Sequence, residues 1–129
     1  MARIASRDMP PGLQGARVLI VEDDALLLMD LEAILMDAGA EVVGLCRTVA
    51  DGLVAAQRET IAAAVLDVRI GGDTIAPVAR HLASRGTPFV FYTGQVESDP
   101  AIAEWPDHAI IAKPAQAKTI VAAVHGLLR

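Results

Sequence analysis

The stretch that decides the fold is Val18-Leu19-Ile20-Val21-Glu22-Asp23-Asp24, in which an apolar run leads directly into acidic residues. A short apolar run without polar alternation is typical of a strand that is buried on both faces. In open α/β sheets, ligands bind just outside the carboxyl ends of such strands. The stretch therefore predicts both a central strand and one edge of a binding site.

Four further apolar runs predict buried strands. They are Val42–Leu45, Ala62–Leu66, Phe89–Tyr92 and Ala109–Ala112. Like the first run, they do not alternate between apolar and polar residues, so we expect helices on both faces of the sheet.

Segments with helical periodicity separate these strands. The side chains expected to face the sheet are Leu27, Leu31, Ile34, Leu35 and Ala38 in the first helix, Leu53 and Val54 in the second, and Ile120, Val121, Val124 and Leu128 in the last. A third helix is expected over Thr74–Arg85, and a short fourth one begins at Ser98. Gly39 and Gly86 lie where a glycine often ends a helix.

Strands that alternate with helices are typical of a parallel, doubly wound α/β sheet. With right-handed crossovers, the pattern predicts a flavodoxin-like (βα)5 fold with the strand order 2-1-3-4-5. The switch point of that order lies after Val21 and Leu66. We place the domain at residues 17–129 and interpret Met1–Ala16, which contains prolines and glycines but no apolar periodicity, as a flexible tail.

Composition and charge exclude several classes of protein. A chain of 129 residues is expected to form one domain, and the single cysteine, Cys46, excludes an internal disulfide. The formal net charge of -5 argues against nucleic acid or an anionic membrane as the direct partner. No apolar run approaches the roughly 18 residues of a membrane span. We expect a soluble, cytoplasmic domain.

Carboxylates follow the two strands that flank the switch point. Glu22, Asp23 and Asp24 follow the first strand, and Asp67 ends the third. Clustered carboxylates repel one another unless a cation neutralises them, and Mg²⁺ prefers oxygen ligands. The sequence therefore predicts a Mg²⁺ site. Two simpler interpretations stay open, in which Asp24 caps the next helix and Asp67 only opens a turn.

Polar residues also end the last two strands, as Thr93-Gly94 and Lys113-Pro114. A hydroxyl and an ammonium at neighbouring strand ends can both contact an anion held between them, and lysine acts there as a point charge for phosphate. Each residue alone has a simpler interpretation, as a turn threonine and a solvated lysine. Carboxylates follow the first and third strands, a hydroxyl follows the fourth and an ammonium follows the fifth. This combination favours a single site at the carboxyl ends of the four strands.

From Arg17 to Arg129 the chain resembles the receiver domains of bacterial two-component response regulators. The matching segments are Val18–Asp24, Ala64–Asp67, Tyr92–Gly94 and Lys113-Pro114. All occur in the order and at the spacing of the family, which makes the resemblance specific. The run Pro88–Gly94 also resembles the FAT GUY subgroup, named for a Phe-Ala-Thr-Gly motif, although Tyr92 replaces the alanine.

The resemblance implies that Asp67 accepts a phosphoryl group from a phosphohistidine of a sensor histidine kinase or a histidine phosphotransfer protein. The implied Mg²⁺ ligands are Glu22, Asp23, Asp67 and the backbone carbonyl of Arg69. Lys113 and Thr93 would contact the phosphoryl oxygens. Phosphorylation would switch the interaction with a downstream partner protein.

The sequence departs from the receiver pattern in two places. Ile110 stands where most receivers have an aromatic switch residue. Gly71 replaces the usual proline after the phosphoacceptor, and with Gly72 it predicts a mobile loop.

We interpret the chain as a stand-alone response regulator. It is expected to carry out its own phosphotransfer and autodephosphorylation but not to turn over substrates as an enzyme. The alternative to a stand-alone protein is that the chain is a piece of a longer one. A pseudo-receiver, which binds partners regardless of phosphate, is the alternative function. An aspartyl phosphatase ranks last, because such enzymes need a second acid where this chain has Arg69.

Overall fold

The computed structural model of the chain describes residues 12–94, 100–106 and 108–128. Its core is a five-stranded parallel sheet in the order β2-β1-β3-β6-β7. The strands are β1 (Arg17–Val21), β2 (Glu41–Cys46), β3 (Ala63–Leu66), β6 (Phe89–Thr93) and β7 (Ile110–Ala112). Since β6 and β7 are the fourth and fifth strands of this sheet along the chain, the predicted flavodoxin-like fold and its strand order 2-1-3-4-5 are confirmed.

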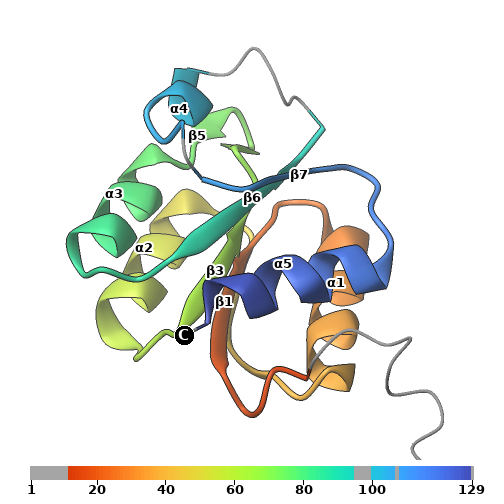
Figure 1. The fold of residues 1–129 in the computed structure, drawn as a ribbon. Coiled ribbons are helices and arrows are strands. Elements are labelled where there is room, and N and C mark those ends of the chain that lie inside the picture. The colour runs from red at the N-terminus through yellow and green to blue at the C-terminus, as the bar shows by residue number, and fades with distance from the viewer. Residues whose placement is uncertain (1–11, 95–99, 107, 129) are drawn as a thin grey trace, which may run out of the picture.

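Helices cover both faces of the sheet (Figure 1). They are α1 (Ala25–Asp37), α2 (Val49–Arg58), α3 (Ala76–Ser84), α4 (Pro100–Ala103) and α5 (Ala117–Leu127). Apolar residues of α1 and α5 form one core cluster with the sheet, and those of α2 and α3 form the other. The start predicted for α4 at Ser98 lies outside the described residues. None of the helices described is long and apolar enough to span a membrane.

Burial differs between the middle and the edges of the sheet. β3 and β6 are buried along their whole length, and β1 is buried after its first residue. The prediction of full burial is wrong for the edge strands β2 and β7, where residues such as Leu45 are exposed. An edge strand has a neighbour on one side only, so less of its surface is covered.

The helices adjoining β2 bury somewhat different faces than predicted. In α1 the buried residues are Leu28, Leu31 and Leu35, so the buried face is centred beside Leu27 rather than on it. In α2, Val54 is 44% exposed, and the prediction that it faces the sheet is wrong. Gly52 and Ala56 take that face, because the helix approaches the sheet so closely that a Cβ on Gly52 would lie 3.0 Å from Val21 Cγ2.

The segment before β1 is packed against the domain where the structure describes it. Leu13 is fully buried in the cluster under α1, and its N–H donates to the carbonyl of Ala38 at 2.8 Å. Gly15, at a φ of 75°, donates to Gly39. Leu13 and Gly15 thus contact the domain, while Met1–Pro11 lie outside the described residues, and the flexible tail and its boundary at residue 17 stay predictions.

The loop after Asp67 forms a small antiparallel hairpin of β4 (Arg69–Ile70) and β5 (Asp73–Thr74). Gly71 and Gly72 make its two-residue turn with φ values of 59° and 91°. Two consecutive positive φ angles are typical of a type I′ turn, which glycine adopts without steric cost. The loop predicted to be mobile thus contains a short stretch of regular strand pairing, and its mobility stays a prediction.

Candidate functional site

Three carboxylates meet at the carboxyl ends of β1 and β3. Glu22, Asp23 and Asp67 each place an oxygen within 4.8 Å of the others. The parallel register that pairs Val21 with Leu66 brings the following residues to the same edge of the sheet. Glu22 and Asp67 are buried, with 1% and 7% of their surface exposed. The sequence prediction of an acidic cluster at the switch point is therefore confirmed.

Backbone amides hold two of these carboxylates in place. Glu22 Oε2 accepts the N–H of Asp24 at 3.1 Å, and Asp23 Oδ2 accepts the N–H of Gly71 at 2.9 Å. Asp24 itself caps α1, because its Oδ1 accepts the N–H groups of Leu26 and Leu27. The capping interpretation that the sequence left open for Asp24 is thus confirmed.

Lys113 extends from the end of β7 into the acidic cluster. Its Nζ lies 2.8 Å from Asp67 Oδ2 and 2.7 Å from Glu22 Oε1. Its backbone N–H donates to the carbonyl of Thr93 at 3.0 Å, which continues the pairing of β6 with β7. Lys113 is therefore part of the acidic site rather than a solvated lysine.

The remaining predicted residues lie at the same edge of the sheet. Thr93 is buried, with 2% of its surface exposed, at the end of β6. Arg69 begins β4, two residues after Asp67, and its side chain is exposed. Arg69 thus lies close to Asp67 along the chain, and Thr93 is hydrogen-bonded through its backbone carbonyl to Lys113.

The contacts of the site shift the pKa values of three groups. Burial raises the pKa of Glu22, and this outweighs the opposing effect of the Lys113 ammonium. The Gly71 N–H lowers the pKa of Asp23 by stabilising its charged form. Burial alone would lower the pKa of Lys113, but Asp67 and Glu22 beside it outweigh burial and raise that pKa.

Replacing Glu22 with glutamine is expected to raise the melting temperature of the metal-free protein by a few degrees at pH 7. The raised pKa means that the folded state binds the Glu22 proton more tightly than the unfolded state, so ionising Glu22 costs stability above its ordinary pKa of 4.5. Glutamine does not ionise. The gain should therefore shrink as the pH falls through the raised pKa of Glu22 and be absent below 4.5, which melting curves from pH 3.5 to 8 would measure. A gain of the same size at every pH would contradict this account.

The site fits a small hard cation. Its donors are carboxylate oxygens, the type that Mg²⁺ prefers. Glu22 Oε1 is buried and, among the described residues, accepts no hydrogen bond of good geometry, although Lys113 lies beside it. Among the described residues, Lys113 forms ion pairs with Glu22 and Asp67. The Arg47 guanidinium contacts the backbone carbonyl of Asp23. One paired ammonium beside three carboxylates leaves negative charge to be neutralised. A divalent ion bound by Glu22, Asp23 and Asp67 would supply that charge.

Sequence reasoning missed two contacts of this site. One is the Gly71 N–H on Asp23, which the Gly71-Gly72 pair between two short polar and β-branched stretches signals as a hairpin turn. The other is Tyr92, whose hydroxyl oxygen accepts the N–H of Ala115 at 3.2 Å just beyond Lys113. No sequence signal identified the second contact.

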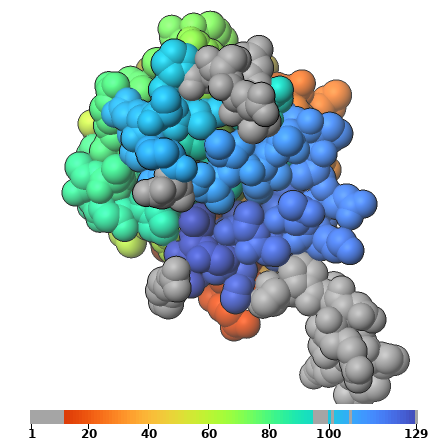
Figure 2. Space-filling model, turned by 45° about the horizontal axis from the view of Figure 1, so that its top comes forward, coloured from red at the N-terminus to blue at the C-terminus, as the bar shows by residue number. Residues whose placement is uncertain are grey.

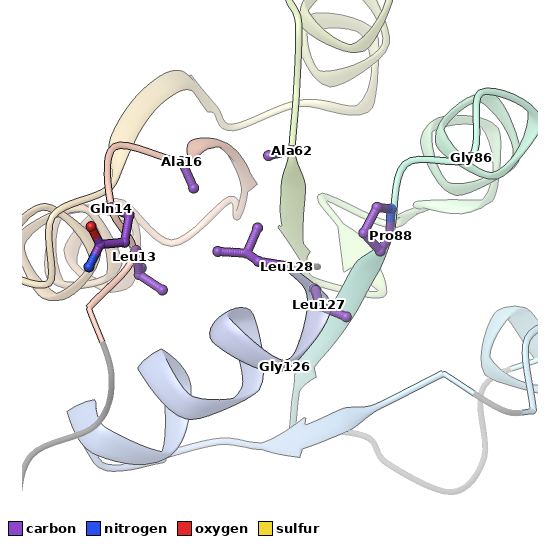
Figure 3. Close-up of a pocket in the computed structure, with 9 residues that line it drawn as sticks. All are labelled: Leu13, Gln14, Ala16, Ala62, Gly86, Pro88, Gly126, Leu127 and Leu128. Atoms are coloured by element: carbon purple, nitrogen blue, oxygen red, sulfur yellow. The ribbon is translucent and has the colours of Figure 1, made fainter. Parts of the chain in front are cut away.

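An open groove of about 730 Å³ lies at the amino ends of the strands, on the side of the sheet away from the acidic cluster (Figure 3). Its lining residues include Ala16, Ala62 and Pro88, which precede β1, β3 and β6. None of the residues that line it ionises. Within the described part of the chain, the groove therefore offers shape but no charged side chain for catalysis or metal binding.

Comparison with known proteins agrees with this site. No protein-family model and no curated protein matches the chain. Among solved structures, SdrG from Sphingomonas melonis Fr1 is 36% identical with a TM-score of 0.75, and the match covers 87% of this chain and 95% of SdrG. A response regulator receiver protein from Sinorhizobium medicae WSM419 is 28% identical with a TM-score of 0.78, over 90% and 96% of the two chains.

A larger protein shares the same fold over part of its length. The response regulator PhyR from Brucella abortus is 25% identical with a TM-score of 0.76. The match covers 96% of this chain but 51% of PhyR, so the chain spans about half the length of that relative. The sequence identity, the sheet order and the acidic cluster beside Lys113 agree with one another. The chain belongs to the response regulator receiver domains of two-component signalling.

Proposed function

We propose that this receiver domain accepts a phosphoryl group on Asp67 in a Mg²⁺-dependent reaction. The donor would be a phosphohistidine of a sensor histidine kinase or of a histidine phosphotransfer protein. The observation that carries the proposal is the Lys113 ammonium, which lies 2.8 Å from Asp67 in a pocket with two further carboxylates. An ammonium held between two buried carboxylates, Asp67 and Glu22, suits a site where negative charge grows during the reaction.

The residues of the site divide the chemistry between them. An Asp67 oxygen attacks phosphorus while the bond from phosphorus to the imidazole nitrogen breaks, and the electron pair of that bond stays on the imidazole. Lys113 gives up its ion pair with Asp67 to contact the phosphoryl oxygens, and Thr93 donates a hydrogen bond to them. Glu22, Asp23, Asp67 and the carbonyl of Arg69 would hold Mg²⁺. The ion, when bound, neutralises charge on the carboxylates and the phosphoryl group.

Within the family, we propose that the chain is close to the FAT GUY subgroup. The supporting observation is the run Pro88–Gly94, which resembles the subgroup motif. It departs from the motif in that Tyr92 replaces the alanine and Gln95-Val96 follows the glycine. Phe89 and Phe91 of this run both point into the cluster under α2 and α3. Tyr92 lies in the cluster on the other face.

We propose that two exposed faces of the domain bind protein partners. α1 begins directly after Asp24 and exposes Leu26, Met29 and Met36, at 79%, 63% and 55%. Apolar residues at this spacing form a stripe beside the acidic site, which suits a docking phosphodonor. The described residues of α4, β7 and α5, coloured cyan to dark blue in Figure 2, lie together on another face. We propose that face for a downstream partner.

Receiver domains are generally not enzymes that release a product, and we propose the same of this chain. Its own reactions would be phosphotransfer and slow autodephosphorylation on Asp67.

The test is the intact mass of the protein after incubation with acetyl phosphate, with and without Mg²⁺. We expect a gain of one phosphoryl group with the metal and none in its absence, because the clustered carboxylates repel the incoming phosphate. If neither acetyl phosphate nor a panel of histidine kinases gives an adduct, the chain is a pseudo-receiver that binds partners regardless of phosphate.

A further inference from the structure

Tyr92 connects the core of the domain to the segment that carries Lys113. It is 3% exposed and packs in the cluster formed by the sheet, α1 and α5. Its hydroxyl oxygen accepts the N–H of Ala115 at 3.2 Å, and Lys113 Nζ lies 5.6 Å from the centre of its ring. One side chain therefore contacts both the functional group of Lys113 and the backbone two residues beyond it.

The backbone donors of this segment are all directed at β6. Pro114 has no N–H, so residues 113–115 offer two N–H groups. That of Lys113 donates to the carbonyl of Thr93, and that of Ala115 donates to Tyr92. The segment is thus fixed at both ends by consecutive residues of one buried strand. Without the Tyr92 hydroxyl, only the first of these two bonds would remain.

We propose that Tyr92 is a positioning residue for Lys113. Its hydroxyl fixes Ala115 and its ring supports the ammonium, so that Nζ reaches Asp67 and Glu22 together. The functional consequence rests on the proposed phosphorylation of Asp67, because the phosphoryl group is what the ammonium is positioned for. The positioning itself exists in the unphosphorylated protein and can be measured there.

The first test replaces Tyr92 with phenylalanine, which keeps the buried ring and removes only the hydroxyl. We expect the rate of phosphorylation by acetyl phosphate to fall about tenfold, the effect of losing roughly one hydrogen bond. The dissociation constant for Mg²⁺ should change by less than about twofold, because the polar contacts of Tyr92 among the described residues are with Ala115 and Lys113 rather than with the carboxylates. Val90→Ala is the matched control, since Val90 is fully buried in the same cluster of the same strand. It should lower stability and leave the phosphorylation rate unchanged.

The second test separates positioning from a structural role. In a Lys113→Met background, Tyr92→Phe should slow the remaining phosphorylation no further, because Tyr92 acts through the lysine. An equal fold decrease in both backgrounds would overturn the proposal.

A spectroscopic test does not depend on phosphorylation. Tyr92 is the only tyrosine of the chain, so incorporation of 3-fluorotyrosine gives one ¹⁹F resonance. We expect Lys113→Met to shift that resonance in the metal-free protein. The shift caused by Lys113→Met should be the same when the substitution is made in the Val90→Ala variant. A resonance that ignores Lys113 would overturn the proposal. If the wild-type protein accepts no phosphate, the proposed function fails while this measurement still decides whether Tyr92 positions Lys113.

Discussion

Asp67→Asn is expected to abolish phosphorylation by acetyl phosphate and Mg²⁺ completely, as measured by intact mass. Asparagine has nearly the shape of aspartate, but its amide is no nucleophile toward phosphorus. It also leaves Lys113 with one fewer carboxylate partner, since the present ion pair at 2.8 Å is lost. The affinity for Mg²⁺ should fall as well, because one of the three clustered carboxylates is gone.

The matched control for this prediction is Asp73→Asn. Asp73 is an exposed carboxylate in β5, on the same segment as Asp67 but outside the acidic cluster. This variant should gain one phosphoryl group at the wild-type rate. A phosphorylated Asp67→Asn protein with a wild-type melting temperature would show that another residue accepts the phosphate, and peptide mapping would then identify it.

Phe89→Ala is expected to cost about 3–5 kcal/mol of unfolding free energy, a large share of the 5–15 kcal/mol typical of a domain. Phe89 is fully buried and lies at the centre of an aromatic cluster. Its ring centroid is 5.4 Å from Phe91, 5.8 Å from Trp105 and 4.3 Å from His108, which stacks on it. Truncation leaves a cavity and removes all three ring contacts.

Urea unfolding followed by Trp105 fluorescence measures this loss, because Trp105 is the only tryptophan and contacts the mutated site. Phe89→Leu should cost less and keeps the measurement possible if the alanine variant does not fold. Met29→Ala is the surface control, since Met29 is 63% exposed, and should change the stability by no more than about 0.5 kcal/mol. A loss below about 1 kcal/mol for Phe89→Ala would contradict the central role of this ring.

Most of the fold was predictable because the strands of an α/β sheet are short apolar runs with clear ends. The predicted bounds of the run Val18–Val21 differ from β1 by one residue, and the order of the strands follows from general rules of chain connection. The edge strands were less predictable, since burial depends on a missing neighbour and not on the strand's own sequence. Val54 illustrates the same limit, because the close approach at Gly52 decides which face of α2 is covered.

The acidic cluster was predictable because parallel strands bring their carboxyl ends to one edge. Knowing that Glu22 and Asp67 end neighbouring strands was enough to place them together. The packing of Leu13 was not predictable, because an isolated leucine between glycines and prolines has no periodicity. Nor was the bond from Ala115 to Tyr92, which depends on the distance between two strands' ends and the direction of one ring.

The hydrogen bonds of the three carboxylates bear on the size of the ion that they can take. Glu22 Oε2, Asp23 Oδ2 and Asp67 Oδ2 are each engaged by a donor of the protein. To chelate an ion through both oxygens, a carboxylate would have to give up that donor. Calcium takes about six to eight oxygen ligands and often binds carboxylates through both oxygens, whereas magnesium binds single oxygens in an octahedral shell that keeps several waters. We therefore expect magnesium to bind more tightly than calcium, because Asp23 and Asp67 each keep one oxygen that takes no part in these hydrogen bonds of the described residues.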